Sequence, residues 1–508
     1  MHFYRKVKFI ILLLLFILIL FLGFFVFFGN DEIDESKIIE NRSKNDMLFF
    51  GLSINGIECS YDSSSNTYYF NSSSGIIKSV LVDSAYDTHY VLKQATDNLY
   101  RILVYTDDFY TYKYVRYTNI PLINISVFNG IPDYNLILGY DDFEYNKLIE
   151  DKMNVFFGLN YENNLFKVNN VRHNSFSSSG ILDVRGASSR MYEKLSYKIE
   201  LNDKLSFMDF DKDDEFALDA LYIDKSKVRN KLSSDMWNLI NDNQFINNDL
   251  NGQFVDVFIN NDYHGLYVLK NLVDKHVTDI SDDGILIKFI DHDDDSVSSG
   301  IYKDFRIVDN EFFNMKVKKY NKDCFNEFIN NMRIFYSTSD RHDYDTISSI
   351  YYIDNYINYK IFVSLISGTD NISKNKYYSM VNSDSKVLIT PWDLDLTWGL
   401  SWNSEPDFYS SFSMSSSSDI AWMDNNIVSD MDDEMFDLLR KRYWELRKNI
   451  ITVDVICNYL DSYENLLIES GSSERDSSKW YPYNVQYEIN QIREWAVRRI
   501  EFLDEYFK

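Results

Sequence analysis

The stretch SGTDNISKNKYYSMVNSDSKVLITPWDLDLTWG, residues 367–399, decides the fold. It follows a segment with helical apolar spacing, residues 354–366, and begins with a polar turn that contains Asp370 and, five residues later, Asn375. Its second half is the apolar strand KVLITPW, which leads directly into Asp393 and Asp395. The pattern predicts a helix, a polar turn and a strand, with acidic side chains at the turn and at the strand end.

This spacing has a chemical meaning in phosphoryl transfer. In protein kinases a loop Asp accepts the hydroxyl proton, an Asn five residues later binds Mg²⁺, and a further Asp on the next hairpin binds metal across the nucleotide phosphates. Asp370, Asn375 and Asp393 occupy these places in order, and Asp395 is a further candidate ligand. Asp and Asn also favour turns and helix caps, so ordinary turn residues are the alternative interpretation.

A predicted hairpin upstream is a second candidate site. The strand GILDVRGASSR, residues 180–190, ends in a turn of small residues, and LSYKIEL, residues 195–201, returns from it. Backbone N–H groups of such a turn can approach phosphates, and a lysine on the neighbouring strand can supply positive charge. An ordinary hairpin with solvated lysines is the alternative. The candidate nucleotide-binding residues are Arg185, Gly186, Ser188, Ser189, Lys194 and Lys198.

Composition excludes several classes of protein. The 508 residues carry 51 Lys+Arg and 78 Asp+Glu, a net charge of −27, so a nucleic-acid partner is not expected. The three cysteines, Cys59, Cys324 and Cys457, are widely spaced and indicate neither a zinc site nor a disulfide framework. With 45% hydrophobic residues, the composition is that of a globular protein.

The amino terminus has the pattern of a membrane anchor. Residues 9–28 are apolar apart from Gly23, which is about the length that a helix needs to cross a bilayer. Basic residues precede this run and acidic residues follow it, so we expect residues 1–8 in the cytoplasm, a stalk at 29–45 and the remainder outside the cell. A cleaved signal peptide is the alternative, but its apolar core would be shorter.

The exported part divides by pattern into two regions. Residues 46–118 run in short alternating segments broken by turn residues, which predicts a small all-β module. Strands and helices alternate in residues 119–508, and the final third is helical. The last helix carries one apolar stripe, which we expect to be core: Val485, Ile489, Ile492, Ala496, Ile500, Leu503 and Phe507.

Taken in order, these motifs resemble the CotH kinase family, the spore-coat-type atypical protein kinases. The resemblance runs from about residue 121 to the carboxyl end. The segments that carry it are PLINISV, RGASSRMYEKLSYKIEL, DDEFALDALYIDKSKVRNKLSSDMW, FVDVFINNDYHGLYVLKNLVDK, GILIKF, SGTDNISKNKYY and ITPWDLDLTWG.

The resemblance implies an α+β, protein-kinase-like fold with a helical carboxy-terminal region, binding ATP and Mg²⁺ or Mn²⁺. Asp370 then takes the place of the catalytic Asp, and Asp393 that of the metal-binding Asp. Lys194 falls on the lysine of the R-G-x-S-S segment, and a helix carries Arg229 and Asp235, the latter the expected partner of Lys194.

The implied reaction is transfer of the ATP γ-phosphoryl group to Ser or Thr hydroxyls of a surface or secreted protein. One departure matters: Asn271 stands where relatives usually have Glu. A non-catalytic surface or coat-assembly protein with a degenerate kinase-like fold is therefore the alternative. Paired carboxylates could also serve a glycosidase, but acidic pairs are too abundant here to be diagnostic.

Overall fold

The structure is a computed structural model of the chain, and it forms two compact units, one within residues 1–51 and 82–115 and one within 52–81 and 116–508. The predicted membrane-spanning segment, residues 9–28, lies outside the residues that it describes. Among those residues, no helix is long and apolar enough to cross a membrane. The residues described are 34–46, 50–72, 75–127, 153–161, 174–186, 188–206, 208, 210–241, 250–274, 278, 280–289, 311–312, 315–337, 342–400 and 423–508.

The first unit is built mainly of strands. The short helix α2 (Glu35–Ile39) precedes β1 (Ser43–Lys44), which pairs in parallel with β9 (Phe109–Thr118). Strands β7 (His89–Thr96) and β8 (Leu99–Tyr105) form an antiparallel hairpin. Residues 52–81, which belong to the larger unit, contain or overlap the remaining short strands of residues 46–118: β2 (Gly51–Ile54), β3 (Ile57–Glu58), β4 (Ser60–Asp62), β5 (Thr67–Asn71) and β6 (Val80–Asp83). The predicted β-rich character of this region is thus present, and its boundaries stay a prediction.

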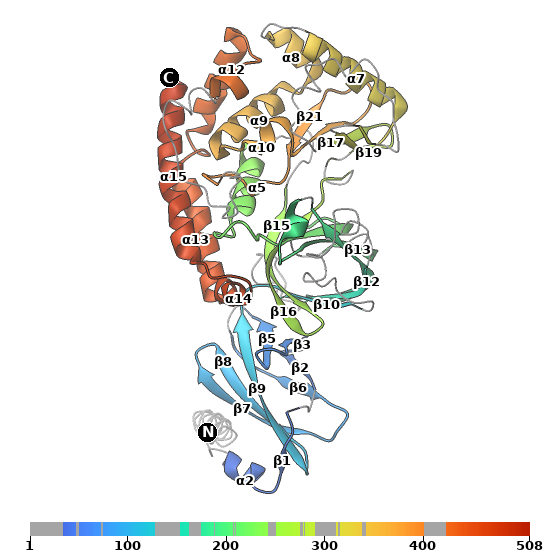
Figure 1. Cartoon of the computed structure of the whole chain (residues 1–508), viewed down its shortest axis with the longest axis vertical. Coiled ribbons are helices and arrows are strands. Elements are labelled where there is room, and N and C mark those ends of the chain that lie inside the picture. The colour runs from blue at the N-terminus through green and yellow to red at the C-terminus, as the bar shows by residue number, and fades with distance from the viewer. Residues whose placement is uncertain are drawn as a thin grey trace, which may run out of the picture. The chain divides into compact units, whose positions relative to one another are not determined.

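A closed barrel forms the first part of the larger unit (Figure 1). Its strands follow the order β10-β11-β12-β13-β14-β16-β15, and β10 closes it by pairing in parallel with β15. Apolar side chains of alternate strand positions fill its interior. The strands are β10 (Leu122–Val127), β11 (Met153–Tyr161), β12 (Asn174–Arg185), β13 (Ser196–Leu205), β14 (Asp213–Asp219), β15 (Gly252–Ile259) and β16 (Asp262–Asn271).

The hairpin expected at residues 180–201 is present in the barrel, and β15 and β16 form another. Strands β12 and β13 pair antiparallel, with Arg185 opposite Ser196, so the small-residue turn lies at their shared end. Strands β15 and β16 are joined through Asn260 and Asn261, whose φ angles of 51° and 63° suit a two-residue hairpin turn.

A second, five-stranded sheet follows in the order β18-β19-β17-β20-β21, with helices packed around it (Figure 1). Buried Trp237 of α5 packs edge-on against Tyr359 and Phe362 of α9, which ties these helices into one core. The elements are β17 (Ile285–Phe289), β18 (Glu311–Phe312), β19 (Met315–Lys319), β20 (Lys376–Met380), β21 (Leu388–Pro391), α5 (Arg229–Ile240), α7 (Lys322–Ser337), α8 (Tyr344–Ile350), α9 (Ile353–Ile366) and α10 (Asp370–Ser373).

The carboxy-terminal third is helical, as predicted. Helices α13 and α15 lie side by side, and α14 packs against β16 of the barrel (Figure 1). All seven residues of the predicted apolar stripe of α15 are buried. The elements are α12 (Asp433–Leu446), α13 (Val453–Glu469), α14 (Ser472–Lys479) and α15 (Val485–Tyr506). The predicted α+β class is therefore confirmed.

Candidate functional site

A hairpin brings the predicted Asn and Asp together. Strands β20 and β21 pair so that Lys376 faces Pro391, which places the residues just outside the pair, Asn375 and Trp392, side by side. The Trp392 N–H donates to the Asn375 carbonyl at 2.9 Å. Asn375 and Asp393 both adopt left-handed backbone conformations, with φ of 53° and 58°. Antiparallel pairing thus explains how residues 18 positions apart reach one place (393 − 375).

Asp370 lies directly beside this hairpin end. It begins the single-turn helix α10, and its Oδ2 accepts a 3.5 Å hydrogen bond from Asn375 Nδ2. The Lys374 ammonium lies 3.1 Å from the same oxygen. Asn371 fixes the turn, because its Nδ2 donates to the carbonyls of Asn375 at 2.8 Å and Trp392 at 2.9 Å. The Asp and Asn of the D-x-x-x-x-N pattern, Asp370 and Asn375, are therefore in direct contact.

These residues open into one cavity of about 1470 Å³ between the barrel and the second sheet. Arg229 and Asp235 are not among the residues that line it, and the side chain of Ser188 lies outside the part of the chain that the structure describes. The predicted residues that do line it are Arg185, Gly186, Ser189, Lys194, Lys198, Asp370, Asn375, Asp393 and Asp395. The structure thus brings most of both predicted sites to the same cavity.

Three cations surround the buried indole of Trp392 beside this cavity. The charged groups of Lys270, Lys288 and Arg185 lie 4.5, 5.8 and 5.2 Å from the ring centroid. They come from β16, β17 and the end of β12, so the indole is where the barrel and the second sheet meet. Cation–π contacts of this kind hold positive charge in place without neutralising it.

Asp219, at the end of β14, partly balances this charge. It forms an ion pair with Lys270, lies 3.6 Å from Arg185, and accepts a 3.1 Å hydrogen bond from Asn230. Burial opposes ionisation of Asp219, but Lys270 and Arg185 together hold its pKa below the usual value.

The pKa of Asp395 is shifted in the opposite direction from that of Asp219. Burial, together with the neighbouring negative charge of Asp393, raises its pKa well above the usual value. Two carboxylates held together in this way repel each other, and a divalent cation bound between them would relieve that repulsion.

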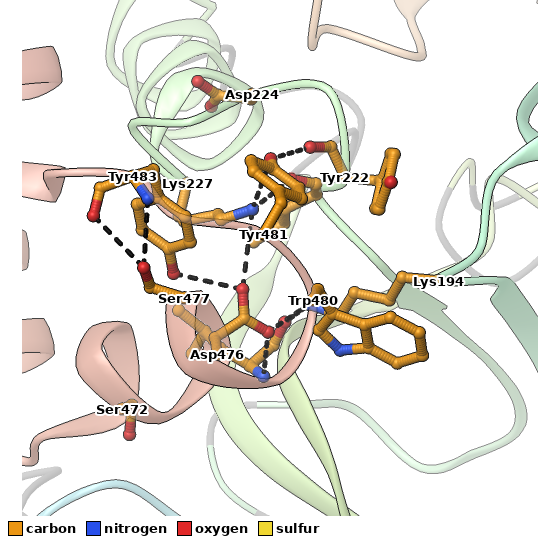
Figure 2. A network of polar contacts seen from close by, with 12 residues as sticks. Lys194, Tyr222, Asp224, Lys227, Ser472, Asp476, Ser477, Trp480, Tyr481 and Tyr483 are labelled. Carbon is orange, nitrogen blue, oxygen red and sulfur yellow. Dashed lines mark hydrogen bonds and ion pairs between the residues drawn. The ribbon is translucent and has the colours of Figure 1, made fainter.

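Lys194 lies elsewhere than expected (Figure 2). Its ammonium donates to the Leu266 carbonyl and forms a 2.6 Å ion pair with Asp476 of α14, and both side chains are 0% exposed. Burial lowers the pKa of Lys194 to about 8, against the opposing effect of Asp476. Lys194 therefore contributes to the cavity wall while its charged group is enclosed by protein.

The predicted ion pair between Lys194 and Asp235 is wrong. Asp235 pairs instead with Lys231, one turn earlier on α5, at 2.5 Å, and accepts a hydrogen bond from Tyr463. Arg229, on the same helix, is buried and pairs with Asp224 at 2.5 Å. Arg229 is buried and Asp235 is partly buried beside Lys231 and Tyr463, so neither side chain lines the cavity. Asn230 of the same helix contacts Asp219.

The donor groups fit a nucleotide with a divalent cation. Among the described residues no three His, Cys, Asp or Glu side chains converge as a preformed metal site. Asp393, Asp395 and Asn375 supply hard oxygen ligands, and Mg²⁺ ordinarily completes its shell with phosphate and water oxygens. Arg185 Nη1 is buried without a hydrogen-bond partner, which suits a phosphate oxygen. Gly186 has φ 109°, and a Cβ there would lie 1.8 Å from Ser189 Oγ, so the turn requires glycine.

Sequence reasoning missed four residues of this site, and one partner outside it. Lys270 and Lys288 lie in the segments GLYVLKN and GILIKF, which carry the family resemblance without singling out these lysines. Asp219 and Trp392 adjoin predicted features, and a search for charged residues beside them could have found both. Asp476 offered no local signal, because it lies 282 residues from Lys194.

The comparisons with known proteins place this geometry in a family. The comparison with curated proteins gives no match. The family model described as CotH kinase protein matches residues 182–503, more than half of the chain and the whole of the cavity. The chain therefore belongs to the CotH kinase family.

Proposed function

We propose that this protein is a kinase that transfers the γ-phosphoryl group of ATP to Ser or Thr hydroxyls of a surface or secreted protein, with Mg²⁺ or Mn²⁺. The observation that carries the proposal is that Asp370, Asn375 and Asp393 meet at one cavity that Arg185 and Lys288 also line. Family membership supports the same reaction class.

In this proposal Asp370 orients the acceptor hydroxyl and accepts its proton at a carboxylate oxygen. Asn375 fixes that carboxylate through its 3.5 Å hydrogen bond. Lys374, 3.1 Å from Asp370, places positive charge where the transferring group becomes more negative.

Asp393, Asp395 and Asn375 would hold the divalent cation, which supplies charge neutralisation across the phosphates when bound. Arg185 and the turn at Gly186 would bind phosphate oxygens from the barrel side. The cavity then has a nucleotide side on the barrel and an acceptor side at Asp370.

Asp370→Asn tests the proposal. The full-length protein is incubated with labelled ATP, Mg²⁺ or Mn²⁺, and co-secreted proteins, and both self-phosphorylation and transfer are measured. We expect transfer to fall by about 10²–10⁴-fold, because positioned proton transfer contributes that much, while ATP binding survives. Asp384→Asn, an exposed position at the tip of the β20–β21 hairpin, is the matched control. Equal transfer by Asp370→Asn and wild type would overturn the assignment.

A membrane-anchored location outside the cell belongs to the same proposal. It is supported by the 20-position apolar run at residues 9–28 and by the basic flank before it (28 − 9 + 1). Protease added to intact cells should digest the large domain and spare the short tail. Protection of the domain would contradict this orientation.

A non-catalytic role in surface or coat assembly is the second candidate, and Asn271 favours it. This residue ends β16 and lines a narrow cleft with Lys270 and Asp393, at the position where relatives usually have Glu. An amide there removes one negative charge beside the proposed cation site. If wild type transfers no phosphate with either metal, Asn271→Glu should create transfer; if it does not, the assembly role is preferred.

A further inference from the structure

Lys288 is the cavity lysine whose surroundings differ most from those of the others. It lies on β17, opposite Tyr377 of β20, and therefore two residues from Asn375, which precedes the hairpin strand (377 − 375). Its ammonium lies 5.8 Å from the centroid of Trp392 and 5.9 Å from that of Tyr377. The side chain is half-buried and lines the cavity.

Other lysines beside the cavity are already paired with carboxylates. Lys198 lies 2.7 Å from Glu215, Lys204 lies 3.4 Å from Asp214, and Lys374 lies 3.1 Å from Asp370. Within the part of the chain that the structure describes, Lys288 has aromatic contacts and neither a hydrogen bond nor an ion pair. A half-buried ammonium whose direct contacts are aromatic rings leaves its N–H donors without a protein acceptor among the described residues.

The charges around Lys288 favour an anion at its ammonium. Burial lowers the pKa of Lys288 to about 8, Asp393 opposes this, and the positive charges of Arg185, Lys318 and Lys270 add to it. An anion with several oxygens could accept hydrogen bonds from these cationic side chains. Other oxygens of the same anion could bind the divalent cation expected at Asp393.

We propose that Lys288 binds the phosphate chain of the nucleotide, together with Arg185 Nη1, which makes no hydrogen bond and lies 3.6 Å from Asp219. The inference rests on the proposed function and deepens it, because it assigns to Lys288 the phosphate contact that the sequence assigned to Lys194. Lys194 is occupied by Asp476 and Leu266, whereas Lys288 faces the cavity with its donors available.

A purely structural role for Lys288 predicts something different. Its stem packs beside Trp392, and a lysine that serves only to cover an aromatic ring is replaceable by an apolar chain of similar length. Lys288→Met keeps that stem and removes the charge, so it separates packing from phosphate binding.

The experiment measures binding to the full-length protein by calorimetry in the presence of Mg²⁺, with ATP, adenosine and inorganic tripolyphosphate as probes. For Lys288→Met we expect ATP and tripolyphosphate to bind roughly 10–100-fold more weakly, as for loss of one charge-assisted hydrogen bond. Adenosine should bind as it does to wild type. Lys288→Arg should recover most of the ATP affinity. Lys204→Met, which removes a cavity lysine paired with Asp214, is the matched control and should leave all three affinities unchanged.

The ratio of ATP to adenosine affinity within each variant decides the outcome, because partial misfolding lowers both affinities alike. A ratio in Lys288→Met equal to that of wild type overturns the role of Lys288 and leaves the kinase proposal standing. Wild type that binds neither ATP nor tripolyphosphate overturns both. Equal losses for ATP and adenosine show a packing role and also overturn the inference.

Discussion

Two charged clusters of the larger unit contain the same chemical groups and use them differently. Around Asp476, Lys194 and Lys227 are enclosed beside tyrosine rings (Figure 2). Around Trp392, Lys270, Lys288 and Arg185 lie beside an indole and two aspartates, Asp393 and Asp395. We call these the Asp476 network and the Trp392 cluster.

The difference lies in how completely the carboxylates are satisfied. Asp476 accepts from Lys194 at 2.6 Å, from the Leu266 N–H at 2.9 Å and from the Tyr483 hydroxyl at 3.0 Å. Burial opposes ionisation of Asp476, yet its two lysines hold the pKa below the usual value. In the Trp392 cluster the pKa of Asp395 is raised and Arg185 Nη1 has no hydrogen-bond partner.

This contrast separates stability from binding. A buried ion that is fully hydrogen-bonded holds segments of the chain together, and removing its partner is costly. Buried charged groups that lack hydrogen-bond partners destabilise the protein when no ligand is bound. A ligand of complementary charge supplies the missing partners. We therefore expect mutations in the Asp476 network to affect unfolding, and mutations in the Trp392 cluster to affect ligand binding.

The largest expected effect is on the stability of Asp476→Ala. This change leaves two buried lysines without their carboxylate, and breaking a buried pair typically costs about 3–5 kcal/mol in the free energy of unfolding. Denaturant titration measures it. Glu474→Gln, at an exposed position on the same helix α14, should change stability by less than about 0.5 kcal/mol. A loss below about 1 kcal/mol for Asp476→Ala would remove the basis of the comparison.

Asp393→Asn should weaken ligand binding without lowering stability, the opposite of Asp476→Ala. Removing one of two mutually repelling carboxylates should leave the unfolding free energy unchanged or raise it, because Asp393 forms no ion pair with the residues that the structure describes. Mg²⁺-dependent ATP affinity should fall about 10–100-fold with loss of one charged ligand. Titration of ATP at limiting metal checks this. Unchanged affinity would show that Asp393 is only a strand-end residue.

His264, which lies beside the Asp476 network, should make the free energy of unfolding depend on pH. This ring lies against Tyr267 and Trp480, and burial, with Lys479 and Lys194 nearby, lowers its pKa from 6.5 to about 3. Between these values the unfolded chain binds more protons, so stability should fall as the pH drops, by at most about 1.4 kcal/mol per pH unit.

His264→Gln should flatten the pH dependence of the unfolding free energy between about pH 6.5 and pH 3. His89→Gln, at an exposed strand end, serves as the control and should keep the slope of wild type. An identical slope in all three proteins would show that His264 does not contribute.

Lys198→Ala should have the smallest effect. Lys198 is paired with Glu215 at 2.7 Å and with Glu200 at 3.5 Å, and both partners are partly exposed. Pairs of this kind contribute about 1 kcal/mol or less. ATP affinity should therefore change less than in Lys288→Met. A larger loss would assign the phosphate contact to Lys198, the second lysine among the predicted nucleotide-binding residues.

The sequence predicted contacts between residues that lie close together along the chain, and it failed for a contact between distant residues. Asp370 and Asn375 are five residues apart, and a hairpin of regular pairing carries Asp393 to them, so local patterns predicted this contact. The apolar stripe of α15 follows from periodicity in the same way. The partner of Lys194 lies 282 residues away on a different element, and Asp235 looked equally suitable. Only the packing of α14 against β16 decides between them.

The hairpin that carries Asn375 and Asp393 also offers a site for attaching a reporter. Its tip, residues 382–385, is closed by hydrogen bonds among its own residues and lies at the end of the strands opposite to Asn375. Strand pairing, and not the length of the tip, fixes the register at the cavity. A short flexible peptide tag inserted after the exposed Asp384 should therefore be tolerated, because lengthening a surface loop costs little. Such a tag would test the proposed exposure of the domain on intact cells without touching either charged cluster.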